Sequence, residues 1–206
     1  MATRSAMKSL LATLSEDVSS LVDQPAKPVD LMEAFCRAMS GTCGRRIRLV
    51  FQIFPPDAPI SGLRLEFADG NEIIVVEERA VDEAKLVIIG HELWHVYQRD
   101  SHCEHASGLQ AAARGLTDHD RLDTLQRAVD HVLKATGLPR EGVRATAARS
   151  DSADIREEDA ETFGLLFGQR ARELMVGPYA QGPTSSATRE GRINLSLLGN
   201  RGGRIR

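Results

Sequence analysis

The sequence lacks the cysteine pattern of a disulfide-stabilised protein. It contains three cysteines, Cys36, Cys43 and Cys103, and no C-x-x-C pair. An odd number of cysteines without such a pair argues against a disulfide framework and favours a reducing compartment. We therefore expect a cytoplasmic protein whose fold depends on its hydrophobic core.

The sequence also lacks a long apolar run and an excess of positive charge. No stretch approaches the about 20 apolar residues that a membrane-spanning helix needs. The short apolar stretch near the N-terminus is interrupted by Ser9, Thr13 and Ser15, so it does not have the core of a signal peptide. The formal net charge is -3, which gives no reason to expect nucleic acid or an anionic membrane as a partner. With 206 residues, 42% of them hydrophobic, the chain is long enough for one soluble globular domain with or without a tail.

Residues 46–77 have the two-residue periodicity of a small sheet. Alternating side chains mark the short runs 47–53 and 63–67, and a third short run, 73–76, is wholly apolar. The dipeptide Asp69-Gly70 between the last two runs is a strong indication of a hairpin turn. The stretch therefore predicts a small antiparallel sheet of about three strands.

Helical periodicity dominates on both sides of this sheet. In most of these segments, apolar residues recur three and four positions apart, and prolines or glycines follow the last apolar residue. The expected helices are 5–22, 30–39, 82–97, 118–136 and 153–175. Together with the sheet, they predict an α+β fold in which helices pack on a small antiparallel sheet.

We expect three regions along the chain. Residues 1–28 form an N-terminal helix and a linker, and residues 29–178 form the main domain, with the helix 118–136 as an insertion. Residues 179–206 form a tail rich in glycine and arginine. A segment of that composition is expected to be disordered.

The most specific motif is His91-Glu92-Leu93-Trp94-His95, on the helix expected after the sheet. Residues four apart lie one turn above each other on a helix, so both imidazoles face the same way and suit a tetrahedral Zn²⁺. Glu92 is turned by about 100° from His91. Its carboxylate can therefore take a proton from a water molecule at the metal without replacing that water. The motif predicts a catalytic zinc site; the alternative is an amphipathic helix with two incidental histidines.

A catalytic zinc needs a third protein ligand, and the acidic start of the last helix offers candidates. Glu157 and Glu161 are four apart on one face, whereas Glu158 is turned by about 100° from Glu157. One carboxylate of the pair can bind zinc while the other accepts a hydrogen bond from a ligand imidazole. Acidic residues are also favoured at a helix N-terminus by the helix dipole alone. The spacing by itself leaves both readings open.

The two motifs together resemble the ImmA/IrrE metallopeptidases of bacteria, which are of the gluzincin type. In that family H-E-x-x-H is followed by a segment similar to E-x-E-A-(N/D)-x-F-A, and residues 156–164 here are R-E-E-D-A-E-T-F-G. The resemblance covers roughly residues 30–178, and its specific motifs lie in 86–97 and 156–164. It implies that Glu157 is the third metal ligand. Glu161 falls at the Asn/Asp position, from which it would orient a ligand histidine in the second shell of the metal.

The resemblance implies a zinc-dependent metallopeptidase in which Glu92 is the catalytic base and His91, His95 and Glu157 hold Zn²⁺. Members of this family are typically paired with helix-turn-helix repressors or antitoxins, which they cleave or inactivate. One alternative is a non-catalytic module that keeps the zinc and titrates a DNA-binding regulator, as a toxin-antitoxin component would. Another is a zinc hydrolase that acts on a non-peptide substrate. A peptide substrate is expected to lie extended along an edge strand within 62–77, where unpaired backbone groups can align it.

Two further histidines follow the active-site helix. His102 and His105 flank Cys103, which suggests a second metal site, although this is not a recognised ligand spacing. One of these histidines, or Tyr97, is also a candidate for stabilising the tetrahedral intermediate of peptide hydrolysis.

Overall fold

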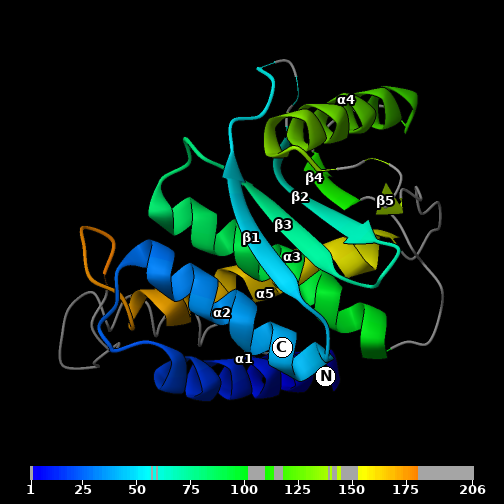
Figure 1. Ribbon diagram of the computed structural model, residues 1–206. Coiled ribbons are helices and arrows are strands. Elements are labelled where there is room, and N and C mark those ends of the chain that lie inside the picture. Colours follow the sequence, from blue (N-terminus) through cyan, green and yellow to red (C-terminus); the bar gives the residue numbers. More distant parts are fainter. Residues whose placement is uncertain are drawn as a thin grey trace, which may run out of the picture.

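The structure, a computed structural model, describes residues 2–56, 58, 60–101, 110–113, 118–138, 140, 143–144 and 153–180. Five helices are described: α1 (Ala2–Leu21), α2 (Pro28–Cys43), α3 (Asp82–Ser101), α4 (Asp118–Thr136) and α5 (Ala153–Arg172). The described strands are β1 (Ile47–Gln52), β2 (Ile60–Phe67), β3 (Glu72–Glu77), β4 (Gln110–Ala113) and β5 (Val143–Arg144). Figure 1 shows the sheet in the middle of the molecule with helices on both of its faces. The expected α+β fold is confirmed.

The predicted hairpin forms the middle of the sheet. β2 and β3 pair antiparallel, with Leu63 opposite Val75, and the turn between them contains Gly70 at a φ of 84°. That left-handed conformation is one that glycine adopts without steric cost. The Asp69-Gly70 dipeptide was therefore a reliable guide to this turn.

The expectation of a wholly antiparallel sheet is wrong for β1. The strand order is β1-β3-β2-β4, with β5 also beside β2, and β1 runs parallel to β3. Pro55 and Pro56 prevent a tight hairpin between β1 and β2, because proline cannot donate the ladder hydrogen bonds that such a turn needs. All four residues 73–76 of β3 are buried, and a strand that is apolar on both faces belongs in the centre of a sheet. β3 therefore lies between β1 and β2.

The sheet divides the hydrophobic core into two clusters. Ile74 and Val76 pack with residues of α1, α2, α3 and α5 on one face, in the larger cluster. Ile73 and Val75 pack with residues of α4 on the other face, in the smaller cluster. Figure 1 shows α4 alone on its side of the sheet, opposite α3. The alternation of side chains along β3 thus separates the α3 face from the α4 face.

The N-terminal helix α1 contributes to the same core as α3. Met7, Leu10 and Leu14 of α1 are buried in the larger cluster. Of the expected tail 179–206, only residues 179–180 belong to the described part of the chain. Among the described residues, no helix is both long and apolar enough to cross a membrane.

The prediction that a substrate docks on an edge strand within 62–77 is wrong in its choice of strand. β3 is paired on both sides, and β2 pairs with β3 on one side and with β4 and β5 on the other. The sequence analysis missed β4 and β5, because these strands have four and two residues and too little alternation to be recognised. In the described sheet, β4 is the last strand of the main path on this side.

Candidate metal centre

The helices α3 and α5 cross at glycines, and this crossing brings the two sequence motifs together. A Cβ atom added at Gly164 would lie 2.6 Å from the carbonyl oxygen of Val87 and 3.2 Å from the backbone nitrogen of His91. One added at Gly90 would lie 2.7 Å from the Cβ of Phe167. Only glycine allows so close an approach of the two backbones. The crossing places the first turns of α5 beside the histidines of α3.

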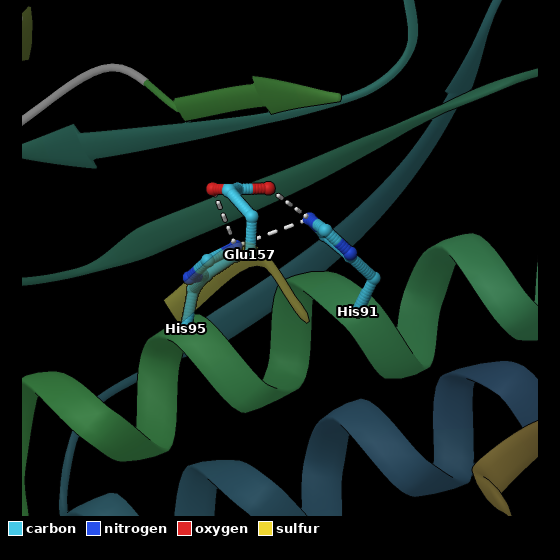
Figure 2. Close-up of side chains that lie close together, drawn as sticks. All are labelled: His91, His95 and Glu157. Atoms are coloured by element: carbon cyan, nitrogen blue, oxygen red, sulfur yellow. Dashed lines mark hydrogen bonds and ion pairs between the residues drawn. The ribbon is translucent and has the colours of Figure 1, made fainter. Parts of the chain in front are cut away.

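Three side chains from the two helices converge on one point (Figure 2). The Nε2 atoms of His91 and His95 are 3.1 Å apart. Each of these nitrogens is 3.4 Å from a carboxylate oxygen of Glu157. His91 and His95 are 8% and 4% exposed, and the side chain of Glu157 is 36% exposed. These three residues form a largely buried group that could hold a metal ion.

The electrostatics of the group favour an ionised carboxylate at Glu157 and shift the pKa values of the two imidazoles in opposite directions. Burial lowers the pKa of His95, and this effect exceeds the opposing effect of its contact with Glu157. Burial also acts to lower the pKa of His91, but the hydrogen bond with Glu157 and the charges of Glu92, Glu157 and Glu161 leave that pKa raised. Burial acts to raise the pKa of Glu157, yet the two imidazoles hold it well below its usual range. Glu157 is therefore ionised, as a metal ligand must be.

Glu92 lies beside this group as a buried carboxylate without a partner. Its side chain is 0% exposed, and neither oxygen has a hydrogen-bond partner among the described residues. Burial raises the pKa of Glu92 from 4.5 to about 7, although His91 and Arg64 act in the opposite direction. An unpaired buried carboxylate is costly to maintain. Groups of this kind are concentrated at functional sites.

The other residues singled out in the sequence have different surroundings. Glu158 and Glu161 are exposed on α5, and the charge of Glu161 contributes to the raised pKa of His91. The role of Glu161 in orienting a histidine remains a prediction. Tyr97 packs beside Trp94, with ring centroids 5.5 Å apart. The segment with His102, Cys103 and His105 lies outside the described residues.

A buried ion network beside the site was missed in the sequence. Glu72 accepts from Arg45 Nε at 2.8 Å and from Arg64 Nη1 at 3.2 Å, and Arg45 Nη2 donates to the carbonyl oxygen of Val96 at 3.0 Å. Arg64 is 4% exposed, and its charge acts on both Glu92 and His95. A signal was present, because Arg64 and Glu66 alternate with apolar residues of β2. Their burial became evident only once helices were seen to cover both faces of the sheet.

Comparisons of the chain with protein-family models, with curated proteins and with solved structures each found no match. The chemistry of the centre is therefore inferred from its donor atoms. Two imidazole nitrogens and one carboxylate oxygen are a donor set that suits Zn²⁺ in a catalytic site, where three protein ligands leave one position open. The unpartnered Glu92 carboxylate next to these donors fits the same kind of site.

Proposed function

We propose that the protein is a zinc-dependent metallopeptidase, as its resemblance to the ImmA/IrrE family implies. The observation that carries the proposal is the unpaired, fully buried carboxylate of Glu92 beside the His91–His95–Glu157 group. A purely structural zinc site needs only its ligands and their supporting hydrogen bonds. A buried carboxylate that satisfies no other group is what a general base requires before substrate arrives.

His91, His95 and Glu157 would hold the zinc, and Glu92 would move the proton. Zinc bound there would polarise the peptide carbonyl and make an attacking water more acidic. Glu92 accepts a proton from that water as the oxygen adds to the carbonyl carbon. It then gives the proton to the leaving nitrogen as the C–N bond breaks. Burial raises the pKa of Glu92 to about 7 in the metal-free site, and a group that accepts and then returns a proton works best with a pKa near the working pH.

The proposed substrate is a partner protein, most specifically a DNA-binding regulator such as a helix-turn-helix repressor or an antitoxin. This part of the proposal depends on the family resemblance alone. With β2 paired on both sides, the position for an extended substrate moves outward to β4, the last strand of the described path. A strand at that position can align a peptide through its backbone groups.

The competing proposal is a non-catalytic module that binds a regulator without cleaving it. A metal centre with a purely structural role would fit the non-catalytic module equally well. The free-energy cost of burying the unpaired Glu92 carboxylate would then have no functional explanation. A zinc hydrolase acting on a non-peptide substrate would use the same groups. Of the three, only the peptidase would cleave a protein partner: the non-catalytic module would bind it intact, and the hydrolase would act on another substrate.

The test is incubation of the zinc-loaded protein with a candidate regulator, the product of the neighbouring gene, followed by intact-mass analysis. We expect defined fragments that are absent when a chelator is present. Glu92→Gln should bind the regulator without cleaving it, while the matched control Glu158→Gln, on an exposed residue of α5, should cleave normally. Stable binding without fragments from the wild-type protein would favour the non-catalytic module. Cleavage by Glu92→Gln would remove Glu92 from the mechanism.

A further inference from the structure

Gly62 of β2 faces α3 directly above the proposed base. A Cβ atom added at Gly62 would lie 3.1 Å from Glu92 Oε1 and 2.6 Å from Ile88 Cγ2. Gly62 is not among the glycines with positive φ, so its backbone conformation is open to other residues. The requirement for glycine at this position is therefore one of space.

The ladder between β2 and β4 is irregular at the same place. Ile60 pairs with Ala113 and Leu63 pairs with Ala111, so three steps along β2 correspond to two steps along β4. A register shift of one residue is the pattern of a β-bulge, a feature that is common next to active sites, where it changes the direction of a strand. Glycine inside a strand weakens the strand and often marks the close approach of another group. Here the approaching groups are Ile88 Cγ2 and the carboxylate of Glu92.

We propose that Gly62 is a positioning residue for Glu92. The missing side chain leaves the space that the Glu92 carboxylate occupies, and so fixes where the proposed base stands. This inference deepens the proposed peptidase function and rests on it. It assigns to β2 a part in the reaction that neither the H-E-x-x-H motif nor the third ligand on α5 supplies.

An alanine at position 62 would act through two separable contacts. Its methyl group would overlap with Ile88 Cγ2 at 2.6 Å, which affects packing, and would press on Glu92 Oε1 at 3.1 Å, which affects the base. Ile88→Ala removes the Cγ2 atom and with it the first contact. In the Ile88→Ala background, Gly62→Ala therefore tests the contact with Glu92 alone.

The experiment compares Ile88→Ala with the double variant Gly62→Ala/Ile88→Ala. We expect the same zinc content, a similar melting temperature and a similar KM for the regulator, but a kcat lowered by about 10–100-fold, the size of effect that a misplaced catalytic group produces. Gly41→Ala is the matched control, because no atom lies within 4 Å of the added Cβ. An unchanged kcat in the double variant would overturn the proposal. A loss of zinc would also overturn it, because Gly62 would then shape the ligands and not the base.

A spectroscopic readout separates this inference from the peptidase proposal. Co²⁺ in place of zinc gives a visible absorption spectrum that reports on the groups around the metal. We expect the Gly62→Ala substitution, in the Ile88→Ala background, to change this spectrum in the same sense as Glu92→Gln does. If the wild-type protein cleaves no regulator, the peptidase proposal fails while the cobalt comparison still decides the role of Gly62. Identical cobalt spectra of Ile88→Ala and the double variant would refute that role.

Discussion

At the scale of single residues, Glu157, the proposed third ligand, is the most informative target. Glu157 lies 3.4 Å from both imidazole nitrogens, whereas Glu158 is exposed on the same helix. We expect Glu157→Gln to lose most of its zinc, because two remaining ligands bind the metal poorly. Glu161→Gln should weaken zinc binding by about 10–100-fold, as loss of an outer partner does, and Glu158→Gln should have no effect. Parallel zinc titrations against a competing chelator measure the zinc affinities of the three variants. Retention of zinc by Glu157→Gln would contradict the expected ranking.

The raised pKa of Glu92 predicts a stability effect in the metal-free protein. The folded protein holds the Glu92 proton up to a pH of about 7, and the unfolded chain releases it near 4.5. The folded state therefore binds more protons between these values, and the free energy of unfolding must fall as the pH rises from about 4.5 to 7. Glu92→Gln removes this loss, so at pH 8 the metal-free variant should be more stable than the wild type by roughly 3 kcal/mol.

Thermal or urea unfolding at pH 4.5 and at pH 8, in the presence of a chelator, measures this difference. Both proteins retain His91, His95 and Glu157, so the comparison isolates Glu92. The free energy of unfolding of Glu92→Gln should exceed that of the wild type by little at pH 4.5 and by much more at pH 8. A variant that is no more stable than the wild type at pH 8 would show that Glu92 finds a partner in the metal-free protein.

At the scale of secondary-structure elements, the close crossing of α3 and α5 determines how His91, His95 and Glu157, the metal group, lie relative to one another. Gly164→Ala would place a methyl group 2.6 Å from a backbone oxygen of α3, which cannot rotate away. Gly168→Ala would meet the Cγ2 atom of Val87 at 3.0 Å, and a side-chain methyl group can move. We expect Gly164→Ala to destabilise the protein by about 1–3 kcal/mol, as overpacking does, and to weaken zinc binding. Gly168→Ala should be neutral or stabilising, because alanine favours helix by about 1 kcal/mol over glycine.

Urea unfolding and zinc titration of the two glycine variants test this expectation together. If the two substitutions change stability and zinc affinity equally, the helices can move apart at residue 164 without displacing Glu157 from the histidines. A stability loss in Gly164→Ala without any loss of zinc affinity would show that Glu157 reaches the histidines independently of the crossing.

The elements themselves were predictable to different degrees. The hairpin of β2 and β3 was predicted because its alternation and its Asp69-Gly70 turn are local properties of the chain. The parallel pairing of β1 with β3 was not, because it depends on which strand is apolar on both faces once all helices are packed. β4 and β5 were missed because a short strand is stabilised by its neighbour more than by its own sequence.

At the scale of the whole molecule, the buried ion network connects four separate parts of the fold. Glu72 of β3 joins Arg64 of β2 to Arg45, which follows α2 and holds the backbone of α3 at Val96. Removing the anion would leave buried cations without it, which costs about 3–5 kcal/mol in comparable cases. We expect Glu72→Gln to lower the free energy of unfolding by about that amount. Asp130→Asn, in the exposed pair with Arg140, should change it by less than about 1 kcal/mol.

Urea unfolding of the zinc-loaded proteins makes this comparison. A Glu72→Gln variant as stable as Asp130→Asn would mean that water or another residue compensates the lost charge. Zinc affinity measured on the same samples shows whether the network also fixes the position of α3.

The residues of the candidate site were also predictable to different degrees, depending on whether their role follows from local spacing or from distant contacts. His91, Glu92 and His95 were found from their spacing on one helix, and Glu157 was reached through a second motif. Gly62 and Arg64 escaped detection because their importance depends on α3, about thirty residues along the chain, which Gly62 approaches closely and whose Glu92 and His95 are influenced by the charge of Arg64. Nothing in the local sequence indicates that Gly62 lies opposite the proposed base, Glu92. Only the packing of β2 on α3 shows it.

The division of the core by the sheet has a consequence for the dynamics of the molecule. The metal group belongs to the α3 face, and α4 packs on the opposite face with a separate apolar cluster. Because local opening follows such packing units, the amide hydrogens of α4 should exchange with solvent at a rate that zinc leaves unchanged. Those of α3 and α5, which the ion would tie together, should exchange more slowly when zinc is present. Local opening on the α4 side of the sheet would therefore be independent of the proposed metal, whereas opening on the α3 side would be suppressed by it.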